Sequence, residues 1–244
     1  AVNLNIFETV SDVTQPSNST LPHVRSDIAE YKRASAFKLT RFLINQFYQP
    51  GERVYARASV GYYEEMFAGT GGQVLYLPAG ANWATDLAVD WVAQRNHEGL
   101  GFDFYKYNTV TAIASFHYRL PMDMTATVRA GRFLAKDEGA RFELKRRFAS
   151  GWEVGAWYTR TNGNDITSPG SPGDPYYDKG IFLSLPLNTL LTRDTQATAF
   201  MPIAPWTRDV GARVVSPLDL YRLMEKPLML DVHDRDGLVR LGDV

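Results

Sequence analysis

The residues most suggestive of a functional site in this chain are a run of charged side chains that alternate with apolar ones. The charged members are Arg141, Glu143, Lys145 and Arg147. Alternate side chains of a β-strand point to one face, so these residues would share a face while Phe142 and Leu144 lie opposite. With Arg129 and Glu153 they are candidates for a network of ion pairs around an interior. The alternative is the solvated face of an open sheet.

Residue types that usually carry catalysis show no productive spacing. The histidines are scattered, and we expect solvated or packing roles for His23, His97, His117 and His233. Glu64 and Glu65 are adjacent, so in a strand they would point to opposite faces and could not act as a pair. Residues 69–72 lack the Lys and the helix of a phosphate-binding loop, and we expect a hairpin turn there. We predict no catalytic residues, no metal and no cofactor, although carboxylates from separate strands could still build a glycosidase.

Composition narrows the class of protein. The 244 residues include 26 basic and 27 acidic side chains, so the chain offers no basic face for nucleic acid. It contains no cysteine, which excludes disulfides, thiolate metal sites and a lipidated cysteine within this sequence. The 13 Tyr, 13 Phe and 5 Trp suit aromatic girdles or sugar-stacking surfaces. The N-terminus lacks a Met and a signal peptide, and we expect a processed piece or the later part of a longer polypeptide.

Short segments with apolar and polar residues in alternation must position these side chains. One face of the segment 152–159 carries Trp152, Val154, Ala156 and Tyr158. The opposite face carries Glu153, with Trp157 as its apolar exception. A soluble β-sandwich would bury the apolar face, whereas an outer-membrane barrel would turn it toward lipid. The alternation alone leaves both alternatives open.

Such segments follow one another at intervals typical of antiparallel strands. We expect strands at 1–10, 54–66, 73–77, 85–94, 102–107, 110–120, 124–134, 140–148, 152–161, 180–187, 195–202 and 211–215. Segments 24–32 and 35–48 fit neither strand nor helix periodicity cleanly. Most links are too short for parallel crossovers, and one long loop spans 162–178. The predicted fold is all-β: an antiparallel meander closed into an outer-membrane β-barrel of roughly ten to thirteen strands. It would occupy residues 1–217, followed by a peripheral short helix and polar tail at 218–244.

Several strings, in order from about Val24 to Tyr221, resemble one protein family. They are Tyr55–Gly69, Val74–Pro78, Gln94–Arg95, Ala130–Gly139, Arg147–Phe148 with Gly151–Trp152 and Gly155, Tyr177–Leu187 and Thr207–Arg213. Together they are similar to the YjbH/GfcD family of exopolysaccharide and capsule biosynthesis proteins. The resemblance implies a Gram-negative outer-membrane protein whose membrane part is a β-barrel. This chain would correspond to the C-terminal barrel of longer members, which often begin as lipoproteins. It implies no reaction.

The resemblance and the charge pattern together predict a non-enzymatic role in exopolysaccharide secretion or assembly. The candidate glycan or lumen contacts are Arg129, Arg132, Glu143, Lys145, Arg147, Glu153, Asp178, Arg208 and Asp209. The expected partners are outer-membrane lipid, a polysaccharide, and other export proteins or an upstream segment of the same polypeptide, with no nucleic acid. The expected location is the bacterial outer membrane. The alternatives are a structural scaffold for export components and a soluble glycan-binding β-sandwich.

Overall fold

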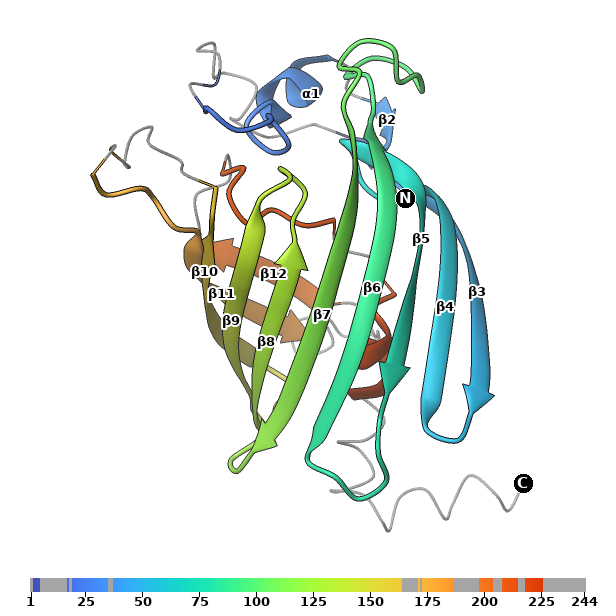
Figure 1. Ribbon diagram of the computed structural model, residues 1–244, viewed down its shortest axis with the longest axis vertical. Coiled ribbons are helices and arrows are strands. Elements are labelled where there is room, and N and C mark those ends of the chain that lie inside the picture. Colours follow the sequence, from blue (N-terminus) through green and yellow to red (C-terminus); the bar gives the residue numbers. More distant parts are fainter. Residues whose placement is uncertain are drawn as a thin grey trace.

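Ten consecutive strands form one antiparallel sheet in the computed structural model of the protein (Figure 1). They are β3 (Phe42–Gly51), β4 (Val54–Tyr62), β5 (Phe67–Tyr76), β6 (Trp83–Gln94), β7 (Asn108–Leu120), β8 (Met124–Arg132), β9 (Glu138–Arg147), β10 (Glu153–Thr161), β11 (Lys179–Pro186) and β12 (Thr198–Ile203). The remaining elements are β1 (Val2–Leu4), which pairs with β2 (Phe37–Leu39), and α1 (Ile28–Ala34). The structure describes residues 2–4, 17, 19–34, 37–163, 171, 173–186, 198–203, 208–214 and 218–225.

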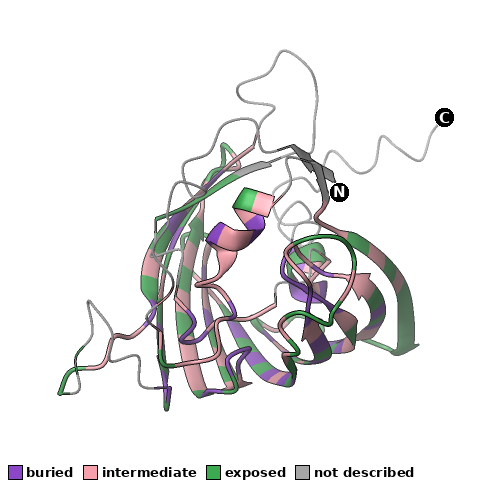
Figure 2. Cartoon of the chain, turned by 90° about the horizontal axis from the view of Figure 1, so that it is seen from above, coloured by how far each residue is buried: buried purple, intermediate pink, exposed green. Residues whose placement is uncertain are grey.

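The sheet is a meander in which each strand pairs with the strand before it. Its order runs from β12 through β11 and so on to β3. The antiparallel all-β meander expected from the sequence is therefore confirmed. Figure 2 shows that the sheet curves around a hollow side. Within the described residues β3 and β12 each pair on one side only, so the sheet is open along these two edges.

The distribution of polarity across this sheet is the reverse of that in a soluble domain. On the outer, convex face Val154 and Tyr158 are 46% and 41% exposed, and Trp152 and Ala156 are exposed as well. On the inner face polar side chains are buried: Arg57, Gln73, Asp86, Ser115, His117, Thr125, Thr127 and Thr159. Strand alternation places the two sets on opposite faces. No second sheet covers the outer face in the part of the chain that the structure describes, which contradicts the β-sandwich alternative for these strands.

Three local predictions are wrong. Residues 102–107 form a turn-rich loop, because Gly99 and Gly101 on one side break the chain away from the sheet. Residues 69–72 continue β5 and do not turn: a Cβ on Gly69 would lie 2.0 Å from the carbonyl oxygen of Trp91, so glycine permits close strand contact there. Residues 211–214 form no strand, since Gly211 turns the chain with a φ of 64°.

Other expectations fall on residues outside the described ranges. These are most of the strand at 1–10, the central part of the long loop, residues 187–197, Thr207, residues 215–217, and the polar tail from 226 onward with His233. The remaining strands lie within a few residues of their expected bounds.

Successive connections alternate between the two ends of the sheet, and the two longest, 95–107 and 162–178, both lie at the upper end (Figure 1). The short turns at the lower end are 52–53, 77–82, 121–123 and 148–152. The upper end carries 63–66, 95–107, 133–137 and 162–178. Helix α1 lies at this upper end, where Tyr31 packs with Met66, Phe67 and Leu134 in an apolar cluster. One hydrophobic cluster of the protein therefore sits at the upper end, above the polar interior.

Candidate functional site

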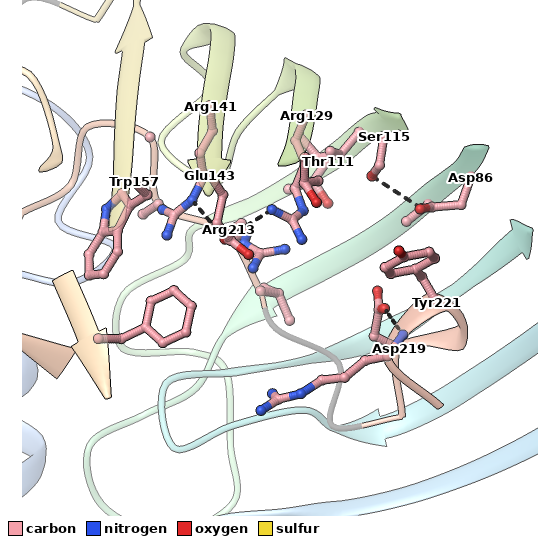
Figure 3. A pocket seen from close by; sticks show the side chains of 18 of the residues that line it. Asp86, Thr111, Ser115, Arg129, Arg141, Glu143, Trp157, Arg213, Asp219 and Tyr221 are labelled. Carbon is pink, nitrogen blue, oxygen red and sulfur yellow. Dashed lines mark hydrogen bonds and ion pairs between the residues drawn. The ribbon is translucent and has the colours of Figure 1, made fainter. Parts of the chain in front are cut away.

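The concave side of the sheet encloses a cavity of about 710 Å³. Strands β4 to β12 line it, and residues 208–214 and 218–225 enter it from the other side (Figure 3). Acidic and basic side chains line it in equal number. The interior as a whole is therefore polar but close to neutral, so any preference for a charged ligand must come from local arrangement.

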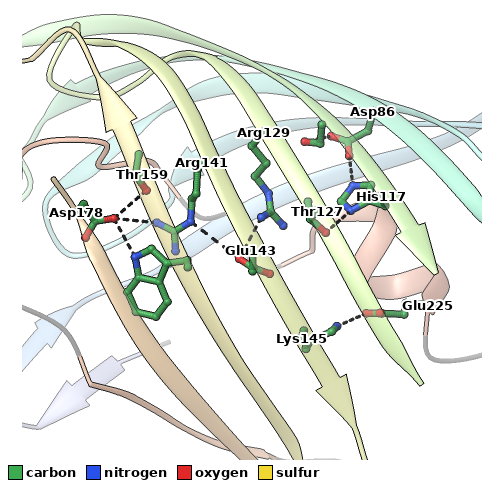
Figure 4. A network of polar contacts seen from close by, with 12 residues as sticks. Asp86, His117, Thr127, Arg129, Arg141, Glu143, Lys145, Thr159, Asp178 and Glu225 are labelled. Carbon is green, nitrogen blue, oxygen red and sulfur yellow. Dashed lines mark hydrogen bonds and ion pairs between the residues drawn. The ribbon is translucent and has the colours of Figure 1, made fainter. Parts of the chain in front are cut away.

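Neighbouring strands bring the predicted charged residues together (Figure 4). Arg129 on β8 and Arg141 on β9 are direct cross-strand partners. Nη1 of Arg129 donates to Oε2 of Glu143 at 3.1 Å, and Nε of Arg141 lies 4.0 Å from the same oxygen. One carboxylate thus serves two guanidinium groups, each largely shielded from solvent, which makes this pairing stronger than one on a surface.

Asp178 anchors the other side of Arg141. Its Oδ2 accepts from Nη1 of Arg141 at 3.3 Å, from Nε1 of Trp157 at 2.9 Å and from Oγ1 of Thr159 at 3.0 Å. The Arg141 guanidinium also lies over the Trp157 ring, 4.8 Å from its centre. The apolar exception in the strand pattern is therefore explained, because Trp157 is an interior hydrogen-bond donor.

A second polar cluster lies on β6, β7 and β8. Nε2 of His117 lies 2.7 Å from Oδ2 of Asp86, and its Nδ1 lies 3.0 Å from Oγ1 of Thr127. The ring of Tyr221 stacks on His117 with 3.6 Å between centroids and 5° between planes. One face and both nitrogens of the imidazole are thus used by the protein, and His117 has a packing role.

The helix at 220–225 belongs to this interior. The sequence predicts a peripheral helix, but Leu220 and Tyr221 are buried against Leu75 and Ala84. Oδ1 of Asp219 accepts from the Arg222 backbone N–H at 3.0 Å and so caps the helix. The expectation of a peripheral helix is wrong because these two apolar side chains find a buried surface on the inner face of the sheet.

Further polar contacts hold the helix to the sheet. Nε2 of Gln73 donates to Asp219, and the Leu220 N–H donates to Oε1 of Gln73. Nζ of Lys145 lies 2.6 Å from Oε2 of Glu225. Burial would raise the pKa of Asp219, but the Arg222 N–H, the Gln73 amide and the charges of Arg129 and Arg213 together hold it below its usual range.

Arg213 differs from the other interior cations. Its backbone carbonyl accepts from Nη2 of Arg25, but its guanidinium makes no hydrogen bond or ion pair with any residue that the structure describes. It lines the cavity close to Arg129, Arg141 and Glu143 (Figure 3). Burial lowers the pKa of Arg213 to about 9, and the charges of Arg129 and Arg141 act in the same direction. Arg213 still carries its charge at neutral pH.

The predicted site residues separate into two groups. Those that line the cavity are Arg129, Glu143, Lys145, Glu153, Asp178 and Arg208. Arg147 lies at one end of this group, with its Nε 4.0 Å from Oε1 of Glu153. Arg132 and Asp209 are not among the cavity residues. Asp209 is buried and accepts from the backbone N–H groups of Arg25 and Ser26, so it ties two distant segments together.

Sequence reasoning left several cavity residues out of the site. They are Arg57, Asp86, Asp90, Trp157, Arg213, Asp219, Tyr221 and Glu225. Strand alternation already places Asp86 and Asp90 on a polar face, so that signal could have found them. Arg213, Asp219 and Glu225 come from non-strand segments, and no local pattern indicates that these return to the interior.

Among the described residues, no group of three or more His, Asp or Glu side chains could hold a metal ion. No helix in the described ranges has the length and apolar character needed to cross a membrane.

The fold and the site define a class of protein: a meandering antiparallel sheet with an apolar exterior and a charged interior. Residues 1–226 match the YjbH family, described as "Exopolysaccharide biosynthesis protein YbjH". The chain belongs to this family, as its sequence strings indicate. It is 30% identical over 221 residues to the "Uncharacterized lipoprotein YjbH" of Escherichia coli (strain K12), covering 89% of this chain and 31% of that protein. The chain thus spans about a third of this relative's length. No solved structure matches the chain.

Proposed function

We propose that the sheet closes into an outer-membrane β-barrel whose interior binds or guides an exopolysaccharide without covalent chemistry. The observation that carries the proposal is the reversed polarity of the sheet. Apolar side chains such as Leu87, Phe142 and Ile181 are about half exposed on the outer face, while Asp86 and Arg57 are buried on the inner face. Lipid outside and a polar lumen inside give this pattern in membrane barrels.

Strand length supports a membrane location. Most strands from β3 to β10 have 9 to 13 residues. A tilted strand needs about 9–11 residues to cross the hydrocarbon core. A bilayer would therefore fit around the central part of the sheet, with the connections at its two surfaces.

Exposed aromatic side chains gather near the short-turn end of the sheet. They are Tyr48, Tyr76, Trp83, Phe116, Tyr118 and Trp152. The Trp83 ring lies 5.9 Å from Tyr76 and 6.1 Å from Phe116, which makes a continuous aromatic surface across three strands. Aromatic girdles mark the boundary between lipid and water in membrane barrels. This end of the sheet would therefore lie at one membrane surface.

The choice of a polysaccharide as the ligand rests on family membership. The family is described by exopolysaccharide biosynthesis, and the Escherichia coli relative is described as a lipoprotein, which supports a location in the cell envelope. Charged groups of the cavity can hydrogen-bond sugar hydroxyls, and aromatic rings can cover the C–H faces of a sugar. An upstream segment of the same polypeptide, or other export proteins, would be the protein partners.

The proposal is tested by measuring polymer export in cells that carry Arg129→Gln or Arg147→Glu, with the amount of membrane-inserted protein measured in parallel. We expect export to fall while insertion persists. The matched control is Glu98→Gln, because Glu98 is exposed in the 95–107 loop. Normal export with inserted interior variants would contradict a role of the interior in handling the polymer.

A structural scaffold is the second candidate, and the capped upper end favours it. Helix α1 lies over the interior in Figure 2, and Asp209 holds Arg25 and Ser26 there. Nη1 of Arg25 also lies 2.6 Å from Oε1 of Glu64 at this end. A scaffold would tolerate the interior substitutions but lose export when its surface contacts with other components are changed.

A further inference from the structure

Three guanidinium groups meet in the described part of the interior, and one of them has no direct acceptor (Figure 3). The guanidinium groups of Arg129, Arg141 and Arg213 gather there around Glu143 (Figure 3). Glu143 is shared by Arg129 and Arg141, and Asp178 is engaged by Arg141 and two neutral donors. No carboxylate among the described residues is left to pair directly with Arg213. Asp219 also acts on Arg213, but it already accepts from Gln73 and from the Arg222 N–H, so the Arg213 guanidinium has no direct acceptor among the described residues.

Some hydrogen-bond donors of this arginine cluster have no acceptor among the described residues. Nε of Arg141 is buried and donates no hydrogen bond to the described residues. Arg213 is half-buried and lines the cavity, and its guanidinium makes no hydrogen bond or ion pair with the described residues. Leaving a guanidinium inside a protein without a counter-ion is costly, and the cost is removed when an anion accepts its hydrogen bonds. The planar fork of arginine suits a carboxylate in particular.

The cavity around these arginines suits a sugar that carries a negatively charged substituent. The cavity volume of about 710 Å³ lies within the usual range of roughly 300–1,000 Å³ for small-ligand sites. Phe182 and Phe200 line it with 5.4 Å between their ring centres. Their rings offer an apolar wall close to the cations, as needed for a ring with a C–H face and a charged substituent.

We propose that Arg213, Arg129 and Arg141 form an anion site that takes the carboxylate of an acidic sugar residue in the polymer. This assignment rests on the proposed function, since it names the class of glycan that the interior binds. Arg213 would pair directly with the carboxylate. Arg129 and Arg141 would add electrostatic attraction and hydrogen bonds to it while they remain paired with Glu143. Neutral glycans would lack this contact and leave Arg213 unpaired.

The test measures binding of oligogalacturonate to the full chain in detergent micelles, beside the same oligomer with its carboxyl groups reduced to alcohols. The acidic oligomer should bind at least tenfold more tightly, because a charge-assisted hydrogen bond is worth more than a tenfold change in affinity. Arg213→Met should remove that preference, and Arg213→Lys should keep part of it. The matched control is Arg222→Met, which removes a cavity cation outside the cluster and should leave the preference intact.

Each of the other outcomes would overturn an identifiable part of the proposal. Equal binding of both oligomers, or an unchanged preference in Arg213→Met, would overturn the anion site but leave glycan binding standing. No binding of either oligomer would overturn the anion site and glycan binding by the interior together. Saturable, Arg213-dependent binding of inorganic phosphate without oligomer binding would show a site for free oxyanions and not for a sugar acid. Arg213→Met removes a half-buried charge that has no direct counter-ion, so it should fold at least as stably as the parent.

Discussion

At the scale of single residues, the interior is held together by shared charges. Glu143 shows this most clearly, because its Oε2 is 3.1 Å from Arg129 and 4.0 Å from Arg141. The three residues come from two adjacent strands whose polar faces meet. Buried charges of this kind are stabilised by one another. If one of the three is removed, the remaining charges are left buried without a counter-ion.

Glu143→Gln should therefore destabilise the protein by about 3–5 kcal/mol, the usual cost of breaking a buried ion pair. The change leaves Arg129 and Arg141 beside Arg213 with no carboxylate between them. Thermal unfolding in detergent measures the effect, with Glu98→Gln as the exposed control. In the double variant Glu143→Gln with Arg213→Met, part of the loss should be recovered. Independent, additive effects would contradict the shared network.

Gly211 is a residue whose backbone the fold requires. Its φ is 64°, and a Cβ there would lie 2.4 Å from Cγ2 of Thr159. Gly211→Ala should destabilise by about 1–3 kcal/mol through strain and crowding. Gly80→Ala is the matched control, since Gly80 has a φ of 66° with open space around it. Equal losses in the two variants would mean that the segment 208–214 does not pack against β10.

At the scale of elements, strand alternation predicts most of the sheet. The prediction succeeds because each strand carries apolar side chains on one face and polar side chains on the other, so hydrophobicity alternates along the sequence with a period of two. It fails at residues 102–107, where Phe102 and Phe104 alternate with polar residues but lie exposed in a loop. It also fails at Gly69, where glycine serves close strand contact and not a turn.

The interior segments could not be predicted in the same way. Residues 208–214 and 220–225 have no strand period, and their place depends on contacts with distant residues such as Asp137 and Gln73. Half of the site, with Arg129, Glu143 and Lys145, follows from the alternation in two neighbouring strands, β8 and β9. The other half, with Arg213 and Asp219, requires the three-dimensional structure.

The helix at 220–225 should detach in acid. Asp219 caps it and accepts from Gln73, and its pKa is held below the usual value of about 4. A depressed carboxyl pKa adds stability that is present above the unfolded pKa and is lost as the pH falls through the folded pKa. Protection of the helix amides from hydrogen exchange should persist at neutral pH and fall below about pH 4.

Asp219→Ala should remove that pH dependence and cost about 1 kcal/mol at neutral pH. Asp219→Asn is the control, because asparagine also caps helices but does not titrate. If both variants keep the acid loss of the parent, Asp219 is not the group responsible.

At the scale of the whole molecule, the decisive property is which solvent meets each face of the sheet. The outer face presents apolar and aromatic side chains over ten strands, and the inner face presents ion pairs around a cavity. The aromatic surface at the short-turn end agrees with the proposed contact of the outer face with lipid. Closure of the edges β3 and β12 would complete this separation.

A charge on the outer face distinguishes lipid from water. Val89→Arg places a cation at an exposed position in the middle of β6, away from the aromatic surface. In a membrane barrel it should destabilise by about 2–4 kcal/mol near the bilayer centre. On a water-exposed face the same change should stay within about 0.5 kcal/mol. The free energy of unfolding from lipid vesicles in urea gives the answer.

The central claim is tested most directly by the quenching of a fluorophore at two adjacent positions. The chain has no cysteine, so Val154→Cys and Glu153→Cys each give a single labelling site, on the outer and inner face of β10. In vesicles of brominated lipid, the account predicts strong quenching of the label at position 154 and little at position 153. Equal insensitivity of both labels to brominated lipid, with equal quenching by aqueous iodide, would contradict it.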